Sequence, residues 1–131
     1  MKKLFAIFIV VFALGACSSS DDGNNSSNSQ ITPPSWIQGT WGYEDGMNQF
    51  KFMSDDFCLI NIGSEICYKN INGPGTPEEY KMTFKQQISD SEYTLSMTHI
   101  TQTTTFKFKR KSNNEIYWVH DLLGNITLVK R

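Results

Sequence analysis

The feature of this chain that most constrains its fold is a period-two alternation of apolar and polar residues, which recurs along residues 41–128. Between positions 93 and 98, for example, large apolar residues occupy every odd position and hydroxyl residues every even one. Successive side chains of a strand point to opposite faces, so this pattern predicts strands that are buried on one face. Of the 14 aromatic residues after position 16, all but Trp36 and Tyr117 fall on the apolar phase.

Short breaks separate the alternating stretches, as at positions 45–46 and 61–64. Such breaks favour an antiparallel meander, in which each strand is followed at once by its neighbour. We count eight or nine strands and one longer break at 72–77, whose two prolines and two glycines exclude a central strand. After position 16 no helical periodicity supplies a layer to cover the sheet. The chain is therefore predicted to be all-β, either closing into an up-and-down barrel or packing as two halves.

A short motif precedes the first predicted strand. Positions 36–41 read Trp-Ile-Gln-Gly-Thr-Trp, and the triplet Gly39-Thr40-Trp41 resembles the start of lipocalin-like barrels. In those barrels a Gly-x-Trp motif follows a short entry turn and opens the first strand.

The resemblance implies a small lipocalin-like β-barrel domain over residues 35–131. It also implies that the tryptophan of the motif plugs one end of the barrel and that a late basic residue covers it. Arg110 and Arg131 are the two candidates for that basic residue.

The N-terminus carries a different pattern. Two lysines are followed by positions 4–16, which are all apolar or glycine, as in a secretory signal peptide. This run is shorter than the roughly 20 residues that a membrane-spanning helix needs. Its end, Leu14-Gly15-Ala16-Cys17, resembles the lipobox of bacterial lipoproteins. That resemblance implies a signal peptide over residues 1–16 and acyl chains such as palmitate on Cys17; an ordinary secreted protein is the alternative.

Residues 17–34 are predicted to form a flexible tether, because Ile31 is the only large apolar residue among them. The residue after Cys17 is Ser18, not the aspartate linked to inner-membrane retention in enteric bacteria. The Ser-Asp-Asp stretch that ends at Asp22 resembles the surface-export signal of lipoproteins in one phylum of Gram-negative bacteria. We therefore expect an outer-membrane lipoprotein exposed at the cell surface, with the periplasmic face as the alternative. The membrane is then a partner through the lipid anchor.

The charge of the chain gives no argument for nucleic-acid binding. Loss of the signal peptide lowers the basic count from 12 to 10, against 13 acidic residues, for a net charge of −3. Lys107, Lys109 and Lys111 share an outward phase, which is typical of a soluble strand face. An anionic polysaccharide or a lipid headgroup is the alternative partner of this face.

Cys58 and Cys67 flank a predicted turn, in a chain expected outside the cytoplasm, where thiols are free to oxidise. If Ile60 pairs with Glu65, the two cysteines lie directly opposite each other, close to the spacing that a disulfide accepts. If Ile62 pairs with Glu65, they are staggered. The sequence leaves open a disulfide or two free thiols.

No constellation of residues indicates catalysis, a cofactor or a metal centre. The acidic pairs at 44–45, 55–56 and 78–79 fall at turns, where solvated carboxylates are expected. The chain holds no Gly-x-Ser-x-Gly elbow and no glycine-rich phosphate loop that leads from a strand into a helix. His99 and His120 fall on the inward phase; we interpret them as strand-end histidines, with a metal or polar-ligand contact as the alternative. We therefore predict a protein that is not an enzyme.

Two functions fit these observations. The first is a binding module that holds a small hydrophobic ligand in the barrel interior. The second is a solid-core barrel that acts as a structural or protein-interaction subunit of a cell-surface complex. The residues predicted to line a ligand site share the inward phase of their strands: Trp41, Tyr43, Phe50, Phe52, Tyr80, Phe84, Tyr93, Phe106, Phe108 and Trp118.

Overall fold

The computed structural model describes residues 26–28 and 30–131, so the predictions for the signal peptide, for Cys17 and for the first part of the tether lie outside the described residues. Two 3₁₀ turns occur within these residues, η1 (Ser35–Ile37) and η2 (Glu78–Tyr80). The remaining elements are strands: β1 (Ser26–Asn28), β2 (Gly39–Gly42), β3 (Asn48–Met53), β4 (Asp56–Asn61), β5 (Ser64–Cys67), β6 (Thr83–Ile88), β7 (Glu92–His99), β8 (Gln102–Arg110), β9 (Glu115–His120) and β10 (Gly124–Lys130).

All the strands belong to one antiparallel sheet, with the order β1-β6-β7-β8-β9-β10-β2-β3-β4-β5. The nine strands from β2 onward form the expected meander, because each pairs with its successor except at the step from β5 to β6. The last strand, β10, pairs with β2 and joins the two runs of the meander. The sheet order therefore has two ends, β1 and β5, and the sheet is an open half-barrel rather than a closed cylinder.

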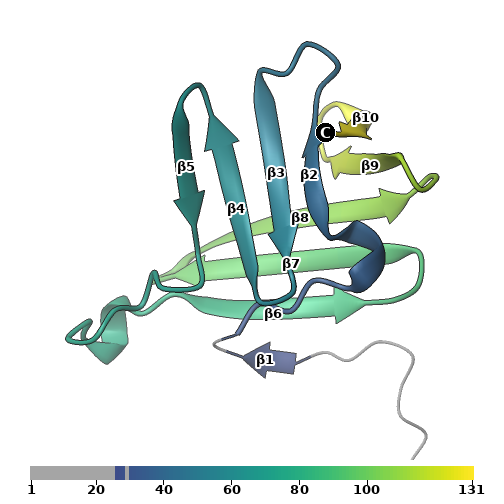
Figure 1. The fold of residues 1–131 in the computed structure, drawn as a ribbon. Helices are drawn as coiled ribbons and strands as arrows, with labels where there is room; N and C mark the ends of the chain where they lie inside the picture. Colours follow the sequence, from purple (N-terminus) through teal and green to yellow (C-terminus); the bar gives the residue numbers. More distant parts are fainter. Residues whose placement is uncertain (1–25, 29) are drawn as a thin grey trace, which may run out of the picture.

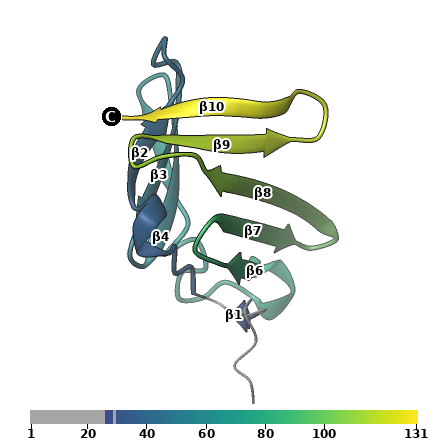
Figure 2. The same cartoon turned by 90° about the vertical axis from the view of Figure 1, so that its right-hand side faces the viewer.

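The half-barrel consists of two runs of strands that cross each other. In Figure 1, β2–β5 stand upright in front of β6–β8, which run across the view; Figure 2 shows β6–β10 stacked beside the first run. The gap between β5 and β6 coincides with the long break that the sequence predicts at 72–77. The expected strand start at Tyr80 is wrong, because this residue lies in η2 with 53% of its surface exposed.

The core lies between the two runs and consists largely of aromatic rings. Phe52 contacts the ring of Phe108 at a centroid distance of 5.0 Å and that of Tyr93 at 6.0 Å, both edge to face. Such pairs contribute about 0.5–1.5 kcal/mol each beyond the area that they bury. The predicted alternation is confirmed in β7, where Tyr93, Leu95 and Met97 are buried between partly exposed neighbours.

The segment from Gln30 to Ile37, here called the N-terminal strap, belongs to the fold. Ile31 is 2% exposed and is part of the core. Gln86 holds the strap: its Nε2 donates to the carbonyl of Gln30 at 2.9 Å, and its Oε1 accepts from the backbone N–H of Thr32 at 2.8 Å. The expected domain boundary at residue 35 therefore falls too late, because one isoleucine and one well-placed glutamine order the end of the tether.

Trp41 is fully buried beside the strap, and its Nε1 donates to the carbonyl of Ile37 at 2.7 Å. The ammonium of Lys130, its cross-strand partner, lies 5.4 Å from the ring centre. Gly39 has a φ of 129°, and a Cβ there would lie 2.9 Å from Cε of Lys130, so this glycine leaves room for the lysine.

The basic residue over the tryptophan is thus Lys130, and the expectation of Arg110 or Arg131 is wrong. The guanidinium of Arg110 donates to Asn113, and that of Arg131 donates to the carbonyl of Tyr43. The register of β10 against β2 determines which basic residue covers the tryptophan, because it pairs position 130 with position 41.

Candidate ligand cleft at the open end of the half-barrel

The inward rows of β3 and β4 change from apolar to polar at the end opposite the strap. In β3 the row runs from Phe52 through Phe50 to Asn48, and in β4 it reaches Asn61. Asn48 and Asn61 are cross-strand partners, so their side chains emerge beside each other. The two asparagines therefore form a polar rim above an aromatic floor.

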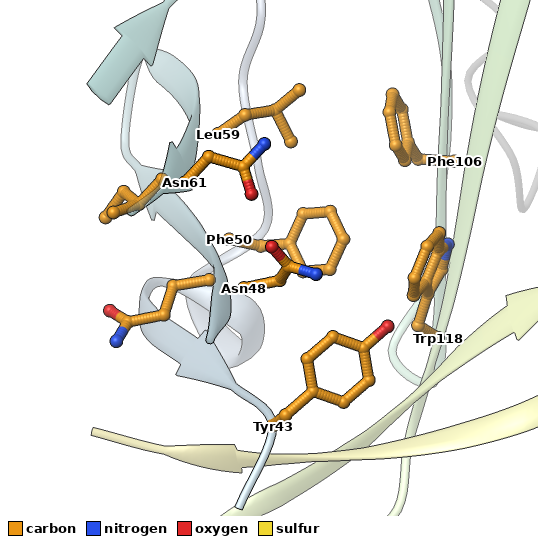
Figure 3. Close-up of a pocket in the computed structure, with 9 residues that line it drawn as sticks. Tyr43, Asn48, Phe50, Leu59, Asn61, Phe106 and Trp118 are labelled. Atoms are coloured by element: carbon orange, nitrogen blue, oxygen red, sulfur yellow. The ribbon is translucent and has the colours of Figure 1, made fainter. Parts of the chain in front are cut away.

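The facing wall comes from β8 and β9. Phe106 and Trp118 lie across from Phe50, at ring-centroid distances of 6.0 Å and 5.1 Å. Between the walls is a cleft of about 230 Å³, and Figure 3 shows the rings of Phe106 and Trp118 facing Phe50, Leu59 and the two asparagines across it. Cross-strand register thus assembles the cleft from both runs of the sheet.

Three polar groups converge on this cleft: the hydroxyl of Tyr43 and the amides of Asn48 and Asn61 (Figure 3). Within residues 30–131, none of the three makes a hydrogen bond to another protein group through its side chain. Partial burial raises the pKa of Tyr43 above its ordinary value of 10.0, and the nearby carboxylate of Asp45 raises it further. The phenol therefore keeps its proton at neutral pH and can donate a hydrogen bond.

A second hollow of about 270 Å³ shares Phe106 and Trp118 with the cleft and extends toward His120. The His120 ring stands edge-on to Trp118 at 5.1 Å. Its Nδ1 accepts from the backbone N–H groups of Leu122 and Leu123 at 3.2 and 3.3 Å, which assigns the proton to Nε2. His120 is thereby fixed as a donor at the edge of the aromatic wall.

The structure does not favour a metal centre built on the histidines. In the described part of the chain, the one cluster with metal-ligand spacing comprises Asp56, Cys58 and Cys67, and it includes neither His99 nor His120. Its two sulfur atoms are bonded to each other, so they are not available as thiolate ligands.

Cys58 and Cys67 are joined by a disulfide, and Ile60 pairs with Glu65, which is the first of the two predicted registers. The bond ties β5 to β4 beside the gap in the half-barrel.

The prediction of a solvated pair at 55–56 is wrong for Asp56, which is 4% exposed. Its Oδ1 accepts from three backbone N–H groups, those of Phe57, Tyr68 and Lys69, at 2.7, 3.1 and 2.7 Å. The carboxylate thus fixes the start of the loop that leaves β5, and its role is structural.

The predicted ligand-lining residues fall into three groups. Four line the cleft: Tyr43, Phe50, Phe106 and Trp118. Five are buried in the packed core: Trp41, Phe52, Phe84, Tyr93 and Phe108. Tyr80 lies outside both groups, on the exterior.

Sequence reasoning missed the two rim asparagines. Asn48 lies two residues before Phe50 and Asn61 two residues after Leu59, so the alternation places both on the inward face. Trp36 falls outside the apolar phase of the sequence, yet its Nε1 donates to the carbonyl of Ser89 and its ring packs against the core. The charge of the predicted lysine face is partly offset, because Lys107 and Lys109 share the carboxylate of Glu92 and Lys111 pairs with Glu115.

Comparisons with protein-family models, with curated proteins and with solved structures found no match to this chain. Over the described ranges, no helix has the length and apolar character that crossing a membrane requires. The geometry of the cleft is therefore the basis for a functional proposal.

Proposed function

We propose that this protein is a lipid-anchored outer-membrane protein of the cell surface, with a lipocalin-like half-barrel that binds one small molecule and catalyses no reaction. The observation that carries the proposal is the cleft of about 230 Å³ at the open end, with an aromatic floor and three converging polar groups. Small-molecule sites are usually concave and apolar with a few placed polar groups, and this cleft has that composition.

The location of the ligand differs from the sequence-based expectation. The middle of the half-barrel is filled by rings such as Phe52, Phe57 and Phe108, none of which is more than 1% exposed. A small ligand therefore has its place in the cleft at the open end, above the contact between Phe50 and Trp118. In this proposal the signal peptide is removed, and acyl chains on Cys17 attach the protein to the membrane.

Ligand-observed NMR on the full chain in detergent tests the proposal. The panel contains small ring compounds, both neutral and ionised, and includes cyclohexanol, benzamide, indole, a methyl glycoside and benzoate. We expect at least one neutral ring to bind and Trp118→Ala to abolish that binding, with Thr103→Ala on the outer face as the control. Absence of binding across the panel, or binding that survives Trp118→Ala, would contradict the proposal.

A second candidate function is docking to a protein of a surface complex, and the edge strand β5 favours it. Among the described residues this strand pairs with β4 alone, and it exposes 53% of Ile66 beside the gap. Unpaired strand edges can accept an extended segment of another chain. Photo-crosslinking from position 66 in intact membranes tests it: one discrete protein adduct supports docking, and cross-links to lipid or to none contradict it.

A further inference from the structure

We propose that the ligand of the cleft is an uncharged saccharide ring, held with one carbon-bound face against Phe106 and Trp118 and with its hydroxyls on Asn48, Asn61 and Tyr43. This inference rests on the proposed function, and it names the chemical class that the cleft selects.

The charge of the lining supports a neutral ligand. The residues around the cleft are aromatic, aliphatic or amide-bearing, and none of those described there carries a charge. A carboxylate, phosphate or ammonium ligand would lose hydration in the cleft without gaining an ionic partner, which is costly. Fatty acids and phosphorylated compounds are therefore disfavoured.

The size of the cleft limits the ligand to about one ring. Sites for drug-sized ligands usually measure about 300–1,000 Å³, and this cleft measures about 230 Å³. The packed rings beneath Phe50 close the way into the core. A long acyl chain or a fused polycycle thus finds no depth to enter, whereas a single six-membered ring fits between the walls.

The polar rim requires hydroxyl groups on that ring. Each asparagine amide offers both donors and an acceptor, and a hydroxyl group can satisfy either kind. Because Asn48 and Asn61 are cross-strand partners, they meet neighbouring positions of one bound ring. A hydrocarbon ring would cover these amides and the phenol of Tyr43 without replacing their hydrogen bonds to water, at about 1–3 kcal/mol for each group left unpaired.

The facing wall complements the other side of a sugar. The faces of aromatic rings carry negative electrostatic potential and attract hydrogens with partial positive charge. The carbon-bound hydrogens on one face of a pyranose ring are hydrogens of this kind. Trp118 is held in place for this contact by edge-to-face packing with the rings of Phe50 and His120, each at a centroid distance of 5.1 Å. The cleft thus combines a stacking wall and a hydroxyl-binding rim, the two features that a saccharide ring matches at once.

A glycan array probed with the full chain, followed by titration of the best uncharged glycan, tests this inference. We expect Asn48→Ala with Asn61→Ala to lower affinity at least about tenfold, since two lost hydrogen bonds cost more than about 1.4 kcal/mol. Asn125→Ala, an exposed strand asparagine outside the cleft, is the matched control and leaves affinity unchanged. Thermal unfolding of each variant checks that the fold is intact.

The outcomes separate the two proposals. Binding of cyclohexanol or indole together with a silent glycan array overturns the saccharide and leaves the binding function in place. Equal glycan affinity in the double asparagine variant also overturns the saccharide inference. Failure of every ring compound to bind overturns the binding function itself.

Discussion

The two ends of the half-barrel use the same chemical group, a side-chain amide, in opposite ways. At the strap end the amide of Gln86 is 2% exposed and is occupied by the backbone of Gln30 and Thr32 and by the hydroxyl of Tyr93. At the open end the amides of Asn48 and Asn61 are exposed and face a cleft. A buried amide with all its partners in place stabilises the fold, whereas an exposed one is available to a ligand.

The aromatic residues repeat this contrast. Trp41 at the strap end is fully buried, with its indole N–H bound to Ile37 and Lys130 over its ring. Trp118 at the open end is partly exposed and lines both hollows. The difference indicates that one end of the molecule supplies stability and that the other end carries the binding surface.

The largest effect that tests this contrast is expected from Trp41→Ala. Removal of a fully buried large side chain costs about 3–5 kcal/mol in unfolding free energy, through lost burial and the cavity left behind. Trp118→Ala removes a partly exposed ring and should cost about half as much. Urea unfolding of both variants measures the difference, and equal losses would show that the two ends are packed alike.

Gln86→Ala is expected to destabilise the protein by about 3 kcal/mol, because it leaves the N–H of Thr32, the carbonyl of Gln30 and the hydroxyl of Tyr93 without their partner. The neighbouring Gln87→Ala is the control; Gln87 is exposed and its loss should cost under about 0.5 kcal/mol. Chemical denaturation compares the two variants. Equal stability of both would mean that the strap contributes nothing to the fold.

A smaller effect should appear at alkaline pH. Burial raises the pKa of Tyr93 far above its ordinary value of 10.0, so above pH 10 the unfolded chain releases a proton that the folded chain keeps. The stability from this group is fully present below pH 10 and falls by about 1.4 kcal/mol per pH unit above it. Tyr93→Phe should remove that part of the slope when unfolding is followed between pH 9 and about 11. An unchanged slope would contradict the burial of this phenol.

The smallest effect is expected from Asn48→Ala combined with Asn61→Ala. Both side chains are exposed and make no hydrogen bond within the described part of the protein, so unfolding free energy should change by under about 0.5 kcal/mol. A thermal melt is sufficient to measure this. A large loss of stability would place these amides in the fold rather than in a binding surface.

Much of the architecture was predictable because the alternation is so regular. The alternating stretches around Phe50, Tyr93 and Trp118 correspond to strands β3, β7 and β9, and the meander follows from the short turns between strands. The pairing of Cys58 with Cys67 was one of two predicted registers, and the two-residue turn at 62–63 selects it. Local chemistry was enough for the strands and the meander, but it left the register between the two cysteines open.

The unpredicted features depend on contacts between distant positions. The role of Lys130 follows from its register against Trp41, which local patterns do not specify. The order of the strap depends on Gln86, 54 residues beyond Thr32 in sequence. Asn48 and Asn61 gain a role in binding only because the second run of the sheet places Phe106 and Trp118 opposite them.

Hydrogen exchange at the three indole N–H groups, followed by nitrogen-15 NMR, tests the contrast between the two ends most directly. The N–H of Trp41 should exchange only through global unfolding, because it is buried and bonded to Ile37. The N–H of Trp118 should exchange fastest, with Trp36, bonded to Ser89 near the surface, in between. Protection of Trp118 equal to that of Trp41 would contradict an open cleft and the binding function built on it.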